Sequence, residues 1–285
     1  MRLAHLAGHE APLAVVADER VAPLAGRLGG VGTVDELLRG GDQLRERLEA
    51  AAAAALDEAP MPLEPGMLAA PLRAPPKIAC VGLNYHDHIR ETGLDTPERP
   101  LIFAKFGSSL IGPDEPIRWP AGLTSQVDWE AELAVVIGRR VRDVPVAEAS
   151  ESVFGYTAAN DVSARDLQFG DGQWVRGKSI DSFCPIGPVL VTADAYDPAA
   201  KRVASRVNGR TMQDSTTAEM IFGVAEIVSF LSCACTLEPG DLILTGTPWG
   251  VGGFRSPPVF LAEGDLVEVD VEGIGVLANP VAGPG

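Results

Sequence analysis

The stretch VDWEAELAVVIG, residues 127–138, decides the fold. It begins with alternating acidic and apolar residues and ends in an unbroken apolar run, which is typical of a strand that enters a buried sheet. Side chains alternate across a strand, so Asp128, Glu130 and Glu132 are expected on one face, about 7 Å apart. The other face is then apolar and belongs to the core, with Val127, Trp129, Ala131 and Leu133.

Short apolar segments between Gly, Pro and Asp turns fill most of the chain after residue 76. Strands are predicted at 77–83, 188–193, 203–207, 241–246 and 266–281, with a hairpin turn at Asn208-Gly209. One helix is predicted over 216–231, where Thr216 and Glu219 fit a capping box. Strands do not alternate with long helices, so the pattern predicts a β-rich α+β fold.

The first 72 residues have a different pattern of apolar, helix-forming and proline residues from the rest of the chain. Short apolar segments lie at 1–6 and 13–16, and a helix is predicted over 34–55. Six prolines between residues 60 and 76 then predict an extended linker. We therefore expect a small N-terminal α/β domain over 1–72 and a larger domain over 73–285.

Composition excludes several classes of partner. The formal net charge of −16 disfavours nucleic acid and anionic membrane surfaces. No apolar stretch approaches the about 18 residues of a membrane span, and the N-terminus does not resemble a signal peptide. The four cysteines form no CxxC pair, which predicts reduced, buried thiols in a cytoplasmic protein.

The acidic residues at the start of 127–138 are the first candidate site. A solvated sheet face is one interpretation. The alternative is a divalent cation with oxygen ligands, because buried carboxylates need a cation to offset their desolvation. The segment TAANDVSARDLQ (157–168) offers one more carboxylate, from Asp161 or Asp166, and three carboxylates would suit Mg²⁺ or Mn²⁺.

The histidines offer a candidate base. His88 and Glu91 are spaced i, i+3, so on a helical turn they would touch, and the carboxylate would orient the imidazole. An incidental surface pair is the alternative. No histidine follows His88, which excludes a three-histidine zinc or iron site in this part of the chain.

Two further signals concern anion binding. The glycine-rich loop in LILTGTPWGVGG (242–253) lacks the Walker lysine, so its backbone amides and Thr247 are candidates for holding a carboxylate rather than a nucleotide. Lys105 and Lys178 are lone lysines among small or apolar neighbours, and each is a candidate contact for an anionic substrate. No GxSxG motif supports a serine hydrolase.

Seven ordered motifs resemble the fumarylacetoacetate hydrolase family over residues 76–281. They are NYHDHIRETG, FAKFGSSL, VDWEAELAVVIG, TAANDVSARDLQ, GKSIDSFCPIGPVLVT, VNGRTMQDSTTAEMIF and PGDLILTGTPWGVG. The resemblance implies a mixed β-roll, a homodimer and one Mg²⁺ or Mn²⁺ ion. It also implies the following roles: metal ligands Glu130, Glu132 and Asp161; a catalytic dyad His88–Glu91; a catalytic Lys178; and substrate contacts Arg165, Gln168 and Thr247.

The implied activity is metal-dependent hydrolysis of a C–C bond in a small 2-oxo or 1,3-diketo acid of the acylpyruvate or fumarylpyruvate type. Decarboxylation of an oxaloacetate-type acid, or isomerisation or hydration of a 2-hydroxy-dienoate, would use the same metal-bound enolate and is the nearest alternative. A non-catalytic binding protein of the same fold would show a broken dyad or ligand set, and both are intact in this sequence. Residues 86–98 are expected to form a lid.

Overall fold

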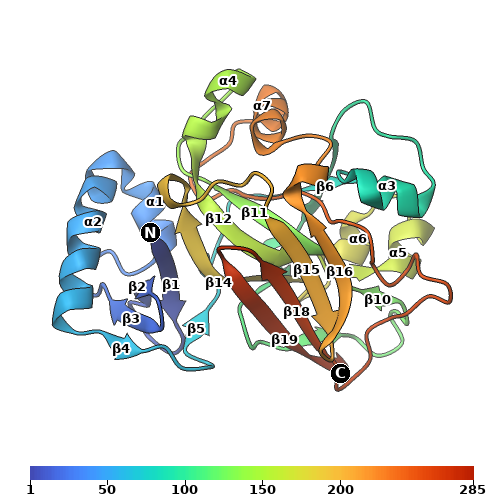
Figure 1. Ribbon diagram of the computed structural model, residues 1–285, viewed down its shortest axis with the longest axis horizontal. Helices are drawn as coiled ribbons and strands as arrows, with labels where there is room; N and C mark the ends of the chain where they lie inside the picture. The colour runs from blue at the N-terminus through green and yellow to red at the C-terminus, as the bar shows by residue number, and fades with distance from the viewer.

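The computed structural model describes residues 1–285. Two open sheets make up most of it (Figure 1), so the predicted β-rich α+β class is confirmed. The larger sheet runs in the order β4 (Met61–Pro62), β3 (Arg20–Pro23), β2 (Leu13–Ala17), β1 (Arg2–Leu6), β14 (Cys184–Thr192), β12 (Val153–Asn160), β11 (Ala131–Ile137), β17 (Leu242–Leu244), β6 (Ile78–Gly82) and β7 (Leu101–Lys105). Two short strands join it at the side: β5 (Leu68–Ala69) pairs with β1, and β8 (Leu110–Ile111) pairs with β14.

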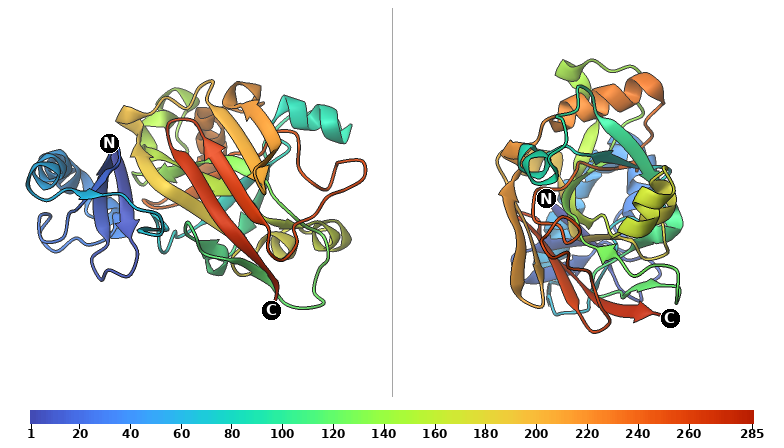
Figure 2. Two further views of the ribbon diagram at one scale, coloured as in Figure 1. Left: turned by 60° about the horizontal axis from the view of Figure 1, so that its bottom comes forward. Right: turned by 90° about the vertical axis from the view of Figure 1, so that its right-hand side faces the viewer.

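The second sheet has five strands and packs across the first (Figure 2). Its order is β16 (Arg210–Thr216), β15 (Arg202–Val207), β18 (Leu266–Val271), β19 (Gly275–Pro284) and β9 (Ile117–Trp119). A two-stranded ladder joins β10 (Val127–Asp128) to β13 (Ser163–Ala164). The helices are α1 (Val34–Arg39), α2 (Gly41–Glu58), α3 (His86–Thr92), α4 (Val146–Ala149), α5 (Arg165–Gly170), α6 (Val175–Lys178) and α7 (Val224–Ala234).

Strand β11 is the centre of the molecule, and all seven of its residues are buried. One face, with Leu133 and Val135, packs in the cluster that contains Val203 and Val269 of the second sheet. The other face packs with the N-terminal strands and helices. Apolar side chains on both faces explain the unbroken apolar run in the sequence.

The helix predicted over 216–231 is wrong at its start. Residues up to Thr216 belong to β16, a 3₁₀ turn follows at Thr217–Glu219, and α7 begins only at Val224. Thr216 does cap a turn, since its hydroxyl accepts the Ala218 N–H, but that turn is not continued. The pairing of β16 with β15 overrides the local helix signal.

Other boundaries also differ from the sequence prediction. The single helix predicted over 34–55 is two helices, α1 and α2, because Gly41 adopts a left-handed conformation with φ of 70°. The strand predicted over 266–281 is a hairpin of β18 and β19. The hairpin predicted at Asn208-Gly209 is confirmed, with φ of 52° and 75° at the two turn residues.

The N-terminal strands extend the larger sheet. Strand β1 pairs antiparallel with β14, where Arg2 faces Val191 and Leu3 faces Leu190. Residues 1–72 lie at one end of the molecule (Figure 2). The division at residue 72 stays a prediction.

The cysteine prediction holds in part. Cys80 and Cys184 are buried and free, as expected. Cys233 is exposed and Cys235 is half-buried, because both lie at the outer end of α7. None of the helices combines the length and the apolar character needed to cross a bilayer.

His5 joins three parts of the N-terminal region and should make it sensitive to acid. Its Nδ1 lies 2.8 Å from the Ala70 carbonyl and its Nε2 accepts the Val34 N–H at 2.9 Å. Burial lowers the pKa of His5 to about 4. A lowered folded-state pKa contributes stability that is complete above the ordinary value near 6.5 and is lost as pH falls toward 4.

We expect the unfolding free energy to fall by about 3 kcal/mol from this group between pH 7.5 and pH 4. Urea unfolding of the wild type and of His5→Gln at several pH values measures it, with the exposed His9→Gln as the control. Equal pH dependence in wild type and His5→Gln would contradict the assignment.

Candidate active site

The antiparallel pairing of β11 with β12 brings the acidic residues together. Ala131 faces Asn160 and Glu132 faces Ala159, so Asp161, which follows β12, arrives opposite Glu130. The Asp161 N–H donates to the Glu130 carbonyl at 2.9 Å. Glu130 and Asp161, which lie 31 positions apart in the sequence, therefore meet at the end of two paired strands.

Glu130, Glu132 and Asp161 form a buried triad, with one carboxylate oxygen from each lying within 4.8 Å of the others. Asp166, which the spacing left open as the third ligand, lies elsewhere: its carboxylate accepts from the Thr124 hydroxyl at 2.6 Å. The structure therefore selects Asp161 for the triad.

Three cations surround this triad. Lys178 Nζ bridges Glu130 at 2.8 Å and Asp161 at 2.7 Å, and Arg165 Nη1 lies 2.6 Å from Glu130. Lys105 Nζ lies 2.5 Å from the other oxygen of Asp161. Glu132 has no cationic partner; its Oε2 accepts only the Gly246 N–H, at 2.6 Å.

The charges within the triad respond to these unequal surroundings. Burial would raise the pKa of Glu130, but Lys178 and Arg165 overcome it and hold the pKa at about 2. For Glu132, burial raises the pKa well above its usual range, and the nearby Asp161 and Glu130 raise it further. Burial also opposes the charge of Lys178, yet Asp161 and Glu130 raise its pKa, so Lys178 is an ammonium group.

These residues fit a divalent metal ion. Three carboxylates supply the hard oxygen ligands that Mg²⁺ and Mn²⁺ prefer, and so few protein ligands leave positions for a chelating substrate. Glu132 in particular is a buried carboxyl without an ion-pair partner, and the attraction of Lys178 does not overcome the effect of burial beside Asp161 and Glu130 on its pKa, which is raised. A dication at the triad would supply that missing charge.

The predicted His88–Glu91 pair is formed on α3. His88 Nδ1 lies 3.0 Å from Glu91 Oε2, and the other oxygen of Glu91 accepts the Gly250 N–H at 3.0 Å. Glu91 is thereby fixed from two sides. Since Glu91 holds Nδ1, Nε2 is the ring nitrogen that can exchange a proton with a substrate.

The glycine-rich loop after β17 passes directly over the triad. Gly246 has φ of 101°, and a Cβ there would lie 2.8 Å from the Cβ of Asn84, so only glycine fits this approach. The Thr247 hydroxyl donates to the Ala131 carbonyl at 3.0 Å and accepts from Gln213 Nε2 at 2.8 Å. Thr247 is therefore held in one orientation beside the triad.

One cavity of about 60 Å³ is lined by most of the predicted residues. Its lining includes His88, Glu130, Arg165, Gln168, Lys178 and Thr247. Aromatic side chains close it: Phe103, Phe169, Trp174 and Phe254. Sequence reasoning missed these aromatic residues, since nothing local distinguishes them from core residues.

Arg165, which lines this cavity, has one donor without a partner. Its Nε and Nη1 are engaged with Asp128, Gln168 and Glu130, whereas Nη2 is buried without any partner. A buried guanidinium N–H without an acceptor is costly, so an anionic ligand atom would complete it.

The predicted substrate contact Lys105 is corrected by the structure. Its side chain is fully buried, it does not line the cavity, and its ammonium is bound to Asp161 and to the Val162 carbonyl. The strand end that carries Lys105 lies behind the triad, so the side chain supports Asp161 instead of facing a substrate.

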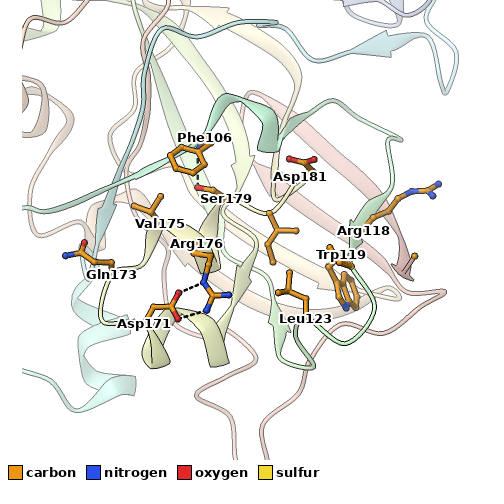
Figure 3. Close-up of a pocket in the computed structure, with 13 residues that line it drawn as sticks. Phe106, Arg118, Trp119, Leu123, Asp171, Gln173, Val175, Arg176, Ser179 and Asp181 are labelled. Atoms are coloured by element: carbon orange, nitrogen blue, oxygen red, sulfur yellow. Dashed lines mark hydrogen bonds and ion pairs between the residues drawn. The ribbon is translucent and has the colours of Figure 1, made fainter.

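A larger cavity, of about 860 Å³, has a lining distinct from that of the candidate site (Figure 3). Its wall includes Phe106, Trp119 and Leu123 together with the Arg176–Asp171 ion pair, and none of the candidate site residues. Size alone would therefore point to the wrong place.

The fold and the carboxylate site define a class of protein, the metal-dependent enzymes that act on small acids. A family model described as "Fumarylacetoacetate (FAA) hydrolase C-terminal" matches residues 77–282. The chain belongs to the fumarylacetoacetate hydrolase family, as its motifs predicted. Members similar to it are hydrolases, isomerases and tautomerases of small acids.

Several known proteins are similar to this chain in sequence and in structure over most of its length. Oxaloacetate tautomerase FAHD2A, mitochondrial, from Bos taurus is 49% identical over 215 residues, which are 74% of this chain and 68% of that protein. Fumarylacetoacetate hydrolase from psychrophilic Exiguobacterium antarcticum has a TM-score of 0.88 at 40% identity and covers 99% of both chains. Maleylpyruvate hydrolase from Sphingobium sp. SYK-6, in complex with manganese(II) ion and pyruvate, has a TM-score of 0.83 at 32% identity and covers 100% of both chains.

The name of the Bos taurus relative describes that protein as mitochondrial. The cytoplasmic location expected from the sequence therefore stays a prediction.

Proposed function

We propose that this protein is a Mg²⁺- or Mn²⁺-dependent enzyme that forms and protonates the enolate of a small 2-oxo acid. One observation carries the proposal: Glu130 of the carboxylate triad, His88 and Arg165 line a single cavity, and the Nη2 of Arg165 is buried without a partner. A cation site, a proton-transfer group and an anion-binding group are what such a reaction needs.

The ion would be held by Glu130, Glu132 and Asp161, and when bound it supplies Lewis acidity that stabilises enolate charge. The protein's own groups do the rest. Arg165 Nη2 binds a substrate carboxylate, and the ammonium of Lys178 offsets negative charge beside Glu130. His88 moves the proton at Nε2, and Glu91 keeps the ring in place through Nδ1.

Within this chemistry we favour keto–enol interconversion of a four-carbon diacid such as oxaloacetate. The cavity of about 60 Å³ is far smaller than the roughly 300–1,000 Å³ typical of sites for drug-sized ligands, which supports a short substrate. The 49% identity to a protein named oxaloacetate tautomerase supports the same choice. A longer diketone would require the aromatic cover around Phe254 to move.

Hydrolysis of a C–C bond in an acylpyruvate or fumarylpyruvate is the second candidate. The His88–Glu91 dyad favours it, because a base oriented by a carboxylate suits the activation of water as well as proton transfer to carbon. Decarboxylation and dienoate isomerisation would start from the same enolate. These reactions differ in their products, so product analysis separates them.

The test is a small panel of acids with Mg²⁺, with Mn²⁺ and with EDTA. We expect the protein to accelerate the enol-to-keto conversion of oxaloacetate, followed by the loss of enol absorbance, and EDTA to abolish the acceleration. Carboxylic acid products from acetylpyruvate would instead establish the hydrolase. Full activity in EDTA would refute the metal-dependent proposal, and no activity on oxaloacetate, acetylpyruvate or a hydroxymuconate analogue would refute the substrate class.

The homodimer implied by the family resemblance is also proposed. Strand β7 ends the larger sheet, and two of its apolar side chains, Leu101 and Ile102, are exposed. An uncharged, apolar sheet edge is a surface that proteins usually cover. Light scattering should give a mass of twice 29.9 kDa, and a monomer mass would contradict the proposal.

A further inference from the structure

Asp128 is the first of the three alternating acidic residues Asp128, Glu130 and Glu132, but it is not part of the carboxylate triad. Strand β10 pairs with β13, where Asp128 faces Ser163, two residues before Arg165. Residues Trp129 and Glu130 separate β10 from β11, so the row is not one continuous strand. The structure thus gives this buried carboxylate a different set of partners from those of Glu130 and Glu132.

The Asp128 carboxylate accepts hydrogen bonds from one arginine and from three backbone amides, and so links them. Asp128 Oδ2 accepts from Arg165 Nε and from the Gly253 N–H, each at 2.8 Å. Oδ1 accepts from the Gly252 N–H at 2.7 Å and from the Trp129 N–H at 2.8 Å. With four donors on two oxygens, Asp128 is not a fourth metal ligand.

Two of the segments that Asp128 holds reach the cavity, through Arg165 itself and through Phe254 next to Gly253. Arg165 is held at Nε by Asp128 and at Nη1 by Gln168 and Glu130, which fixes the guanidinium plane and therefore the direction of the free Nη2. Phe254 directly follows Gly253; its ring lies 5.9 Å from Arg165 Cζ and 5.6 Å from the His88 ring. One carboxylate thus holds both the anion-binding group and the cavity cover.

The local sequence is built for this close approach. A Cβ on Gly252 would lie 2.7 Å from Asp128 Oδ1 and 1.9 Å from the Val259 carbonyl oxygen. A Cβ on Gly253 would lie 3.2 Å from Asp128 Oδ2 and 3.3 Å from Arg165 Cγ. The paired glycines let two successive amides reach one carboxylate.

We infer that Asp128 is a positioning residue that couples substrate binding by Arg165 to the closure of the cavity by the Gly252–Phe254 loop. The inference rests on the proposed function, because it takes Arg165 as the group that binds the acid. Asp128 itself touches neither the metal ligands nor the substrate. Its effect should therefore appear in acid affinity and loop order, and not in metal affinity.

The experiment uses the Mn²⁺-loaded protein and Asp128→Asn, which keeps the shape but leaves only one acceptor oxygen for the four donors. We expect the KM for oxaloacetate and the Kd for oxalate to rise at least about tenfold, since hydrogen bonds to a charged group are lost. The Mn²⁺ Kd should change less than about threefold. Hydrogen exchange of residues 250–254 should be faster than in the wild type. Asp166→Asn is the matched control, because it removes a carboxylate next to Arg165 in the chain whose hydrogen bonds go to Thr124, Ser125 and Leu167 and not to the guanidinium or the Gly252–Phe254 loop.

The inference would be overturned if Asp128→Asn bound oxalate as tightly as the wild type does. It would also be overturned if this variant lost Mn²⁺ binding. If Asp128→Asn does not fold, Gly253→Ala decides, because its Cβ would push the loop from an intact Asp128; an unchanged oxalate Kd there would also overturn it. If the wild type has no activity on these acids, only the proposed function is refuted. The role of Asp128 is still tested in that case, by the oxalate Kd and by the hydrogen exchange of the loop.

Discussion

Replacing Glu132 by Gln should remove tight binding of Mg²⁺ and Mn²⁺ while leaving the metal-free protein almost as stable as the wild type. Glu132 has no basic partner, and its pKa is raised by burial and by Asp161 and Glu130, so a neutral amide is a close substitute in the absence of metal. The Gly246 N–H keeps an acceptor in the glutamine. A ligand charge is nevertheless lost, and we expect the affinity to fall by at least about 10²-fold.

Glu130→Gln is the matched comparison, because Glu130 carries the same metal-ligand role but two cationic partners. Its loss leaves Lys178 and Arg165 buried with less compensating charge, so the metal-free protein should lose about 3–5 kcal/mol. Calorimetric titration with Mn²⁺ and urea unfolding without metal measure the two effects. Stoichiometric, tight Mn²⁺ binding by Glu132→Gln would remove Glu132 from the ligand set.

Replacing His88 by Ala should slow the chemical step by about 10²- to 10⁴-fold, the usual contribution of a positioned general acid–base group. The metal should remain bound, because His88 contacts Glu91 and the Phe254 ring and not the triad. The rate at saturating oxaloacetate and the Mn²⁺ Kd are the two measurements. His86→Ala is the control, since His86 is an exposed histidine on the same helix.

An unchanged rate in His88→Ala would assign proton transfer to another group. A lower rate accompanied by loss of Mn²⁺ would instead point to a structural role of α3. Glu91→Gln should retain part of the activity, because Gln can still bond the imidazole but does not stabilise its positive charge.

Local patterns in the sequence predicted local contacts well. The i, i+3 spacing of His88 and Glu91 gave a pair that forms within one helix, and Asn208-Gly209 gave a hairpin whose positive φ values those residues tolerate. The apolar run 131–137 predicted a strand buried on both faces. Each of these depends on residues fewer than eight positions apart.

The prediction was weaker where local signals compete with pairing. Thr216 and Glu219 look like the start of a helix, yet the register of β16 against β15 keeps Thr216 in a strand. Lys105 looked free to contact a substrate, and only the meeting of β7 with the end of β12 turns it toward Asp161. The strand partner of Thr216 is Arg202, 14 residues away, and Asp161 lies 56 residues from Lys105, so neither outcome follows from the immediate neighbours in the sequence.

The sequence by itself determined the family, the β-rich class and the identity of the acidic, basic and imidazole groups, because alternation and ordered motifs are written along the chain. The tertiary structure decided which of those groups contact one another. The β11–β12 register brings Asp161 to Glu130, a choice that spacing left open and the family resemblance implied, and the β10–β13 ladder places Asp128 beside Arg165. The physical reason is that an ion pair or a metal site depends on distances between atoms, and strand pairing between distant segments sets those distances.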